Sequence, residues 1–200
     1  AGADEVPAAA RDNPLVPPKR LGLNVPFDAP PGMLNRYSAR IFNEYYYRRH
    51  ARNNMEVVID YDRYFYPLDA VNCWNRLYGP GGFTQYQCVL PLSSGREGLV
   101  AILEAVHNAR IGAFLSVLKR FGPASEGMLS FPMAGYTLTM DMPMRRKTLA
   151  FLPELDTIVK RCSGRLYLAK DAHMDPSMLR AGYPRIDHFA QVRKHSAADQ

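Results

Sequence analysis

The chain has 200 residues, of which 47% are hydrophobic and 22% charged, a composition typical of globular domains. No run approaches the roughly 18–20 consecutive apolar residues that span a bilayer, so we expect no transmembrane helix. The formal net charge is +6, carried by scattered Lys and Arg, which is typical of a solvated surface and is also compatible with an anionic substrate, an anionic membrane surface or nucleic acid.

The three cysteines, Cys73, Cys88 and Cys162, are an odd number, lie far apart and form no CxxC pair. This pattern argues against a disulfide framework and against a zinc site. Each lies at a position typical of an apolar core, so we expect three buried thiols. The first residues lack the basic and apolar segments of a signal peptide, and we expect the sequence to be the interior of a longer chain.

Residues 1–33 are rich in Pro and Ala without a sustained period, which predicts an extended connector. A helix is predicted over residues 34–50, with Leu34, Tyr37, Ile41 and Tyr45 on one stripe. So much aromatic surface indicates a partner. We therefore predict that residues 1–50 pack on a further domain.

The remaining elements follow in a recognisable order. After a helix over 68–78, strands are predicted at 82–90, 113–121, 136–142 and 165–169, and helices at about 95–110 and 152–162. Ser94 and Glu97 form a capping-box pattern for the first of these two helices, and Pro153 suits the first turn of the second, which Gly164 follows. Asp175 is expected to cap one of two short final helices. The order strand–helix–strand–strand–helix–strand predicts an α+β class with a ferredoxin-like antiparallel sheet.

Strand alternation assigns side chains to the two faces of this sheet. Tyr86, Cys88 and Leu90 suit the helix side, so Gln85 and Gln87 lie on the open face. The same argument places Thr137, Thr139 and Asp141 outward. For the second strand the pattern leaves the choice between Lys119 and Arg120 open, and we favour Lys119. Tyr167 joins the open face, with Lys170 just beyond the strand. Amides and hydroxyls suit a polyhydroxylated ligand, and the lysines suit a phosphate or a developing negative charge. The alternative is a face that is polar only because water covers it.

Other possible sites are weaker. His50, His107, His173, His188 and His195 have no metal-ligand spacing, so surface or capping roles are expected for them. The sequence contains no GxSxG, P-loop or GxGxxG motif, and the Asp residues at 60, 62 and 69 form no recognisable carboxylate pair.

Several ordered segments together resemble one family. They are YFYPLDAVNCWNRLYGPGGFTQYQ (64–87), VLKRFGP (117–123), LSFPMAGYTLTMDMP (129–143), GRLYLAKDA (164–172) and YPRID (183–187). From about Leu21 to its end, the chain is similar to the C-terminal part of the decaprenylphosphoryl-β-D-ribose 2′-oxidases, which are FAD-linked oxidases of the vanillyl-alcohol oxidase and aldonolactone oxidase superfamily. The resemblance implies a two-domain enzyme in which a separate N-terminal domain provides most of the FAD contacts, so FAD is not expected on this chain alone. It also implies that residues 1–50 pack on that FAD-binding domain and that residues 51–200 form the substrate-binding cap domain.

The family oxidises a secondary hydroxyl of a polyprenyl-phosphoryl pentose to a ketone and passes a hydride to flavin, and a reductase partner completes an epimerisation. The resemblance implies pocket residues at Leu68, Gln85, Gln87, Lys119, Phe121, Tyr167 and Lys170, with Lys170 and Tyr167 near the flavin and Lys170 contributing most to catalysis. At Thr137 and Thr139, which belong to the same pocket, mycobacterial members carry Asn and Cys. This departure leaves the exact sugar open.

Two alternatives come from other classes. The element order and positive charge also describe an RNA-recognition module, but its stacking positions hold Gln85, Gln87, Thr137 and Thr139 in place of aromatics, so we expect no nucleic acid. A family member that has lost catalysis and acts as a scaffold is the other alternative. We expect the chain alone to be colourless, inactive and prone to self-association. A lipid-linked substrate would bring the parent protein to a membrane surface, although the sequence assigns no compartment.

Overall fold

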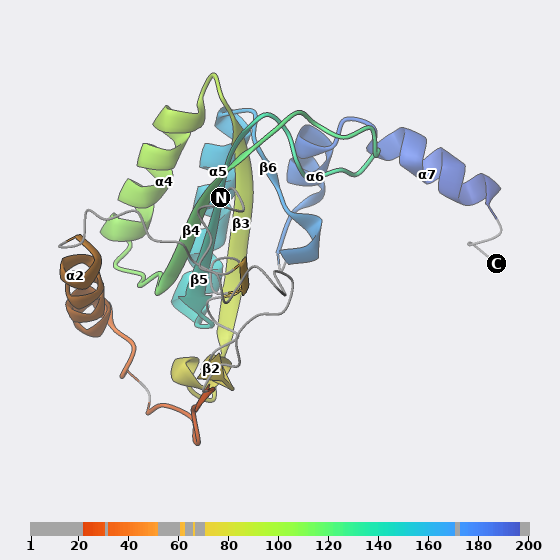
Figure 1. Ribbon diagram of the computed structural model, residues 1–200. Coiled ribbons are helices and arrows are strands. Elements are labelled where there is room, and N and C mark those ends of the chain that lie inside the picture. The colour runs from red at the N-terminus through yellow and green to blue at the C-terminus, as the bar shows by residue number, and fades with distance from the viewer. Residues whose placement is uncertain are drawn as a thin grey trace, which may run out of the picture. The chain divides into compact units, whose positions relative to one another are not determined.

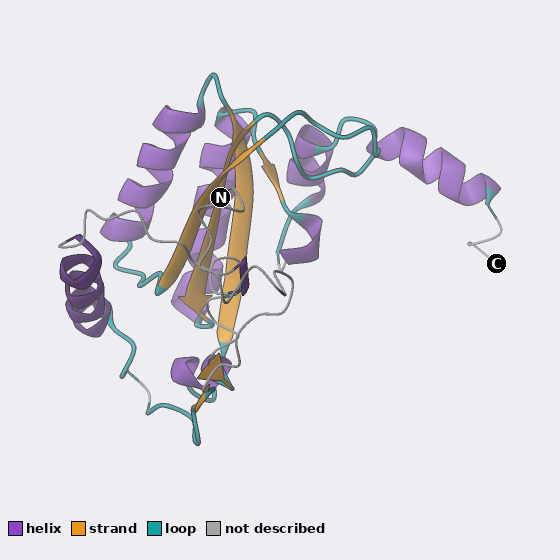
Figure 2. Cartoon of the chain, viewed as in Figure 1, coloured by secondary structure: helices purple, strands orange, loops and turns teal. Residues whose placement is uncertain are grey.

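The computed structural model describes residues 22–30, 32–51, 61–62, 66, 71–170 and 173–196. The chain divides into two units, Ala1–Pro80 and Gly81–Gln200. Helices and a mainly antiparallel sheet give the α+β class that the sequence predicts (Figure 2). Among the described residues, no helix is both long and apolar enough to cross a membrane.

In the first unit, β1 (Leu23–Asn24) and β2 (Val71–Asn72) form a short parallel pair. The Arg76 guanidinium donates to the carbonyl oxygens of Val25 and Pro26 at 3.1 and 2.8 Å, which ties the two segments together. The prediction of a helix over 68–78 is wrong for the described residues 71–78, which form β2 followed by a 3-10 helix, η2 (Trp74–Tyr78). Cys73, between them, is exposed, so its predicted burial is also wrong.

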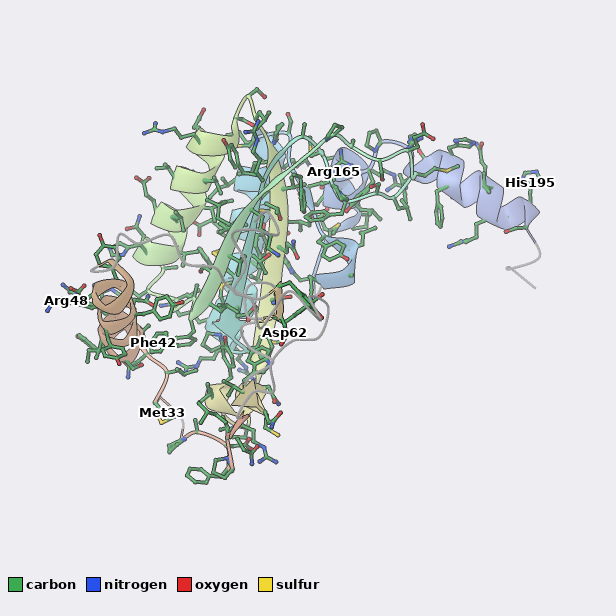
Figure 3. All side chains as sticks on the ribbon, in the orientation of Figure 1. Met33, Phe42, Arg48, Asp62, Arg165 and His195 are labelled. Carbon is green, nitrogen blue, oxygen red and sulfur yellow. The ribbon has the colours of Figure 1, made fainter. Side chains whose placement is uncertain are left out.

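Helix α2 (Arg36–Ala51) confirms the predicted helix in this unit. Asn35 caps it, since its side-chain oxygen accepts from the backbone N–H groups of Tyr37 and Ser38 at 2.8 and 3.1 Å. Its aromatic side chains are well exposed, with Phe42 at 63% and Tyr47 at 69% (Phe42 and Arg48 are labelled in Figure 3). The expected partner for this surface stays a prediction.

The second unit is built on a four-stranded sheet with the strand order β4-β5-β3-β6 (Figure 1). The elements follow the predicted succession: β3 (Phe83–Pro91), α4 (Gly95–Asn108), β4 (Leu115–Phe121), β5 (Gly135–Pro143), α5 (Arg146–Arg161) and β6 (Arg165–Leu166). After β6 come the 3-10 helix η3 (Leu168–Lys170) and two α-helices, α6 (Pro176–Gly182) and α7 (Ile186–His195). All neighbouring strands in this sheet are antiparallel.

The core of this unit lies between one face of the sheet and the helices α4 and α5. Tyr86, Cys88 and Leu90 of β3 are at most 3% exposed and belong to this core, as strand alternation predicts. They pack with apolar residues of β5, α4, α5, β6 and α6: Leu138, Met140, Met142, Ile102, Val106, Phe151, Leu152, Leu155, Val159, Leu166 and Met178. Cys162 is also buried here, so two of the three cysteines are buried as predicted.

The helix ends differ from the sequence predictions for identifiable reasons. Ser94 does precede α4, but its hydroxyl donates to the Cys162 carbonyl at 2.7 Å and makes no cap bond, so the predicted capping box is wrong. Helix α5 begins about two turns earlier than predicted, which places Pro153 inside the helix, on its exposed side. Asp175 caps α6 as predicted and accepts from the N–H groups of Ser177 and Met178.

The turn from α5 to β6 does not use Gly164 as a left-handed helix cap, which is the role that the sequence suggested for it. Ser163, with φ of 55°, takes the left-handed conformation there. Gly164 is required for space instead, because a Cβ at this position would lie 2.5 Å from the Val89 carbonyl oxygen. This close approach brings the end of α5 directly onto β3.

Candidate functional site

The sheet face opposite α4 and α5 carries most of the predicted site residues. Directly paired residues of antiparallel strands share a face. The register pairs Gln85 with Asp141, Gln87 with Thr139, and Lys119 with Thr137. All six residues therefore lie on one face, which confirms the predicted choice of Lys119 over Arg120. Gln85 and Gln87 are half-buried there, not packed under the helices.

Part of this face is covered, which strand alternation alone does not predict. Phe131, in the loop between β4 and β5, is 5% exposed and stacks on Tyr167 with ring centroids 4.6 Å apart. Phe121 meets Phe131 edge to face at 5.8 Å. The Arg165 guanidinium, which is labelled in Figure 3, donates to the Ser130 carbonyl at 2.9 Å and holds this loop. Phe121 and Tyr167 thus form one aromatic cluster with Phe131.

Two side-chain pairs organise the polar part of the face. The Gln85 amide Nε2 donates to Asp141 Oδ1 at 2.6 Å, and the Gln87 Nε2 donates to Thr137 Oγ1 at 3.2 Å. Thr137 and Asp141 are at most 1% exposed, so the expectation that they face open solvent is wrong, although they do point to the predicted face. Thr139, opposite Gln87, is half-buried.

Asp141 is an unusual residue for the middle of a sheet. Burial raises the pKa of its carboxyl, while the hydrogen bond from Gln85 and the charge of Lys170 act in the opposite direction. Its second oxygen, Oδ2, is buried and has no hydrogen-bond partner among the described residues. A buried carboxylate with one unsatisfied oxygen costs stability, and such groups are common where a protein binds a ligand.

A pocket lies at the edge of β3, next to the segment that follows β6. It brings together four predicted site residues, Gln85, Gln87, Tyr167 and Lys170, and its other lining residues are Thr84, Tyr86, Leu152, Leu166 and His173. Strand β6 ends at Leu166, earlier than predicted, and η3 carries Lys170. The backbone N–H of Tyr167 donates to the Gln87 carbonyl at 2.9 Å, and that of Lys170 donates to the Tyr167 carbonyl at 2.9 Å. These two bonds fix the Lys170 backbone beside β3.

The other predicted site residues lie apart from this pocket or outside the described part of the chain. Lys119 and Phe121 are on β4, at the edge of the sheet, and neither lines the pocket, but Phe121 is connected to Tyr167 through Phe131. Thr137 and Thr139 lie on β5 and contribute to the face without lining the pocket. Leu68 is outside the described residues.

A buried chain of three polar residues at the back of the pocket escaped sequence reasoning. The Tyr86 hydroxyl donates to Asp156 Oδ1 at 3.0 Å, and Asp156 Oδ2 lies 3.0 Å from His173 Nε2. The surface or capping role expected for His173 is therefore wrong, since its side chain is 17% exposed. Burial is the main reason that the pKa of Tyr86 is raised well above its ordinary value. One feature of the sequence could have indicated this network: Asp156 lies among the apolar residues on the buried side of α5, where a carboxylate needs a polar partner.

The fold and the site define the class of protein as an α+β unit with a pocket at the edge of its sheet, lined by amides, a lysine and apolar side chains. No family model matches the chain. It is 33% identical over 193 residues to decaprenylphosphoryl-β-D-ribose oxidase of Mycolicibacterium smegmatis, an alignment that covers 96% of this chain and 41% of the oxidase. It is also 45% identical over 78 residues to an uncharacterised protein in the mprA 5′ region of Streptomyces coelicolor, covering 38% of this chain and 21% of that protein.

Almost the whole chain is aligned, but it spans only about two fifths of the length of the oxidase. The likeness supports the relationship to this oxidase family that the sequence motifs predict. Among the described residues, no group of three or more His, Cys, Asp or Glu side chains is arranged to hold a metal ion.

Proposed function

We propose that this chain forms the substrate-binding part of an FAD-dependent oxidoreductase that oxidises a secondary alcohol of a polyprenyl-phosphoryl sugar to a ketone. The observation that carries the proposal is the pocket at β3, which gathers Gln85, Gln87, Tyr167 and Lys170. These are the residues to which the family resemblance gives pocket roles. The identity over 96% of the chain to a decaprenylphosphoryl-β-D-ribose oxidase supports the same assignment independently of the geometry.

The donor set of the pocket suits both a sugar and a flavin. Two amides provide donors and acceptors for sugar hydroxyls, and the exposed ammonium of Lys170 provides positive charge. We assign Lys170 and Tyr167 to the side of the pocket that would face the flavin. The flavin would be bound mainly by another domain and would accept the hydride from the substrate. On that side Lys170 would stabilise the negative charge left on the sugar oxygen once its proton passes to solvent, or the negative charge that the hydride brings to the flavin.

The aromatic cluster has a separate role in this proposal. Phe121, Phe131 and Tyr167 form a continuous apolar wall beside the amides, because their ring centroids follow one another at 5.8 and 4.6 Å. Such a wall excludes water and offers apolar surface to a sugar ring or to the first isoprene units of the lipid. We assign the phosphate to Lys119, whose pairing with Thr137 puts it on the same face of the sheet. A reductase partner would complete the epimerisation by reducing the ketone from the opposite side.

The experiment is anaerobic stopped-flow reduction of the FAD-loaded full-length protein by a short-chain polyprenyl-phosphoryl ribofuranose. Replacing Lys170 with Met keeps much of the side-chain volume and removes the charge, so flavin reduction should slow by roughly 10²–10³. Gln87→Leu should instead weaken substrate binding by about 1–3 kcal/mol. Lys194→Met, an exposed change in α7, is the matched control and should leave the rate unchanged.

Two results would contradict the proposal. Flavin that no polyprenyl-phosphoryl sugar reduces would remove the assigned reaction. A Lys170→Met protein that reduces its flavin at the parent rate would remove Lys170 from the mechanism and leave the pocket assignment dependent on the glutamines alone.

A further inference from the structure

The orientation of one amide follows from the chemistry of its partner. A glutamine side chain carries a donor NH2 group and an acceptor oxygen of similar size, so its hydrogen-bond partners decide which way the amide is turned. At Gln85 the partner is the carboxylate of Asp141, 2.6 Å away. Asp141 Oδ1 is the acceptor in this hydrogen bond, so the NH2 group of Gln85 faces Asp141 and its carbonyl oxygen faces away. Turning the amide over would place two acceptor oxygens against each other.

The surroundings make this orientation costly to reverse. Asp141 is fully buried, and its Oδ2 has no hydrogen-bond partner among the described residues, so the bond from Gln85 is the hydrogen bond that stabilises the carboxylate, beside the charge of Lys170. Reversing the amide would leave a buried charge without a donor. With the NH2 group engaged, the carbonyl Oε1 of Gln85 is left for the pocket that Gln85 lines, and no hydrogen bond to it occurs among the described residues.

Gln87, two residues along the same strand, provides the contrast. Its Nε2 lies 3.2 Å from the hydroxyl of Thr137, and a hydroxyl can both donate and accept. Either orientation of the Gln87 amide therefore satisfies its partner. The two amides that line the pocket differ in this respect: Gln87 can adapt to a donor or an acceptor on a ligand, whereas Gln85 presents an acceptor.

We propose that Asp141 is a positioning residue that holds the Gln85 amide with its carbonyl oxygen toward the pocket, so that the site selects a ligand hydroxyl at this position over groups that only accept. The inference rests on the proposed function for the class of ligand, a polyhydroxylated sugar. It adds a selectivity to that function, because an alcohol can donate to Gln85 and a ketone or an ether oxygen cannot.

The first test measures the amide directly, without any ligand. In the full chain labelled with 15N, the side-chain NH2 of Gln85 should show a hydrogen-bonded, slowly exchanging proton at neutral pH. Asp141→Asn keeps the shape but can donate as well as accept, so both orientations of the Gln85 amide become possible and the protection should decrease. Asp141→Leu, which removes the partner entirely, gives the same expected result if the Asn variant folds poorly. Asp187→Asn, at an exposed carboxylate of α7, is the control.

The second test measures selectivity in the FAD-loaded full-length protein by calorimetric binding of a short-chain polyprenyl-phosphoryl ribofuranose. Analogues carry a methoxy group in place of each hydroxyl in turn. For one position the parent should bind the hydroxyl compound about tenfold or more tightly than the methoxy compound, the loss expected for one hydrogen bond that cannot form. In Asp141→Asn this ratio should fall below about threefold, and Asp187→Asn should keep it.

The outcomes separate the two proposals. An unprotected Gln85 amide in the parent, or a hydroxyl-to-methoxy ratio that Asp141→Asn leaves unchanged, would overturn the positioning role of Asp141. If none of the ribofuranosides binds the parent, the proposed function and the hydroxyl selectivity both fall, and the amide measurement still decides whether Asp141 orients Gln85.

Discussion

Removing the carboxylate of Asp156 should destabilise the protein more than any exposed change on the same helix. Asp156 accepts from the Tyr86 hydroxyl at 3.0 Å and pairs with His173 at 3.0 Å, and Tyr86 is only 3% exposed. In Asp156→Ala the buried hydroxyl loses its acceptor, which costs about 1–3 kcal/mol. The partly exposed pairing with His173 adds on the order of 1 kcal/mol. We therefore expect a loss of about 2–4 kcal/mol in the free energy of unfolding.

The assay is urea unfolding at pH 7, followed by far-UV circular dichroism, for the parent and for a double-mutant cycle with Tyr86→Phe. Because Tyr86→Phe removes the stranded hydroxyl, the double variant should be more stable than the sum of the two single losses predicts, by about 1–2 kcal/mol. Glu154→Ala, at an exposed carboxylate two residues earlier in α5, measures the gain in helix propensity on its own. A loss below about 0.5 kcal/mol in Asp156→Ala, or strictly additive variants, would refute the buried network as a source of stability.

Two further predictions concern packing and thiol chemistry. Gly164→Ala should destabilise the protein by about 3 kcal/mol, because the new Cβ would lie 2.5 Å from the Val89 carbonyl oxygen. The control, Gly122→Ala, should change stability by less than about 1 kcal/mol, because nothing lies within 4 Å of its Cβ. Urea unfolding measures both variants, and equal effects would contradict the packing at Gly164. With iodoacetamide at pH 8 the native protein should be alkylated at the exposed Cys73 and not at the buried Cys88 and Cys162. Both buried thiols are shielded from the reagent, and burial also raises the pKa of Cys88 to about 12. Mass mapping that finds Cys88 modified as fast as Cys73 would contradict the burial of Cys88 in the core.

Strand alternation predicted the faces of the sheet correctly because the period of two is a local property of the backbone. It placed Tyr86, Cys88 and Leu90 in the core and Gln85, Gln87 and Lys119 on the opposite face. What covers that opposite face is a matter of tertiary contacts. The loop that brings Phe131 onto Tyr167 has no periodic pattern, so its position could not be read from the strands. The burial of Thr137 and Asp141 likewise depends on contacts beyond their own strand.

The errors at helix ends have a similar physical origin. Ser94 has the residue type and the spacing of a helix cap, but a hydroxyl donates to whichever acceptor comes near, and the fold brings the Cys162 carbonyl within 2.7 Å. Pro153 fits the first turn of a helix, but it lies on the exposed side of α5, where the helix continues past it. Local propensity in both cases favours one structure, and packing between distant segments decides the outcome.

Buried polar groups connect the stability of this unit to its proposed function. Tyr86 on the helix face of β3 and Gln85 on the other face each bond a buried carboxylate, Asp156 and Asp141 respectively. Both oxygens of Asp156 have partners, which is the arrangement expected of a structural network. Asp141 instead keeps one oxygen buried without a partner among the described residues. Because such a group costs stability without a packing benefit, its presence beside the pocket is better explained by the orientation it imposes on Gln85 than by the fold.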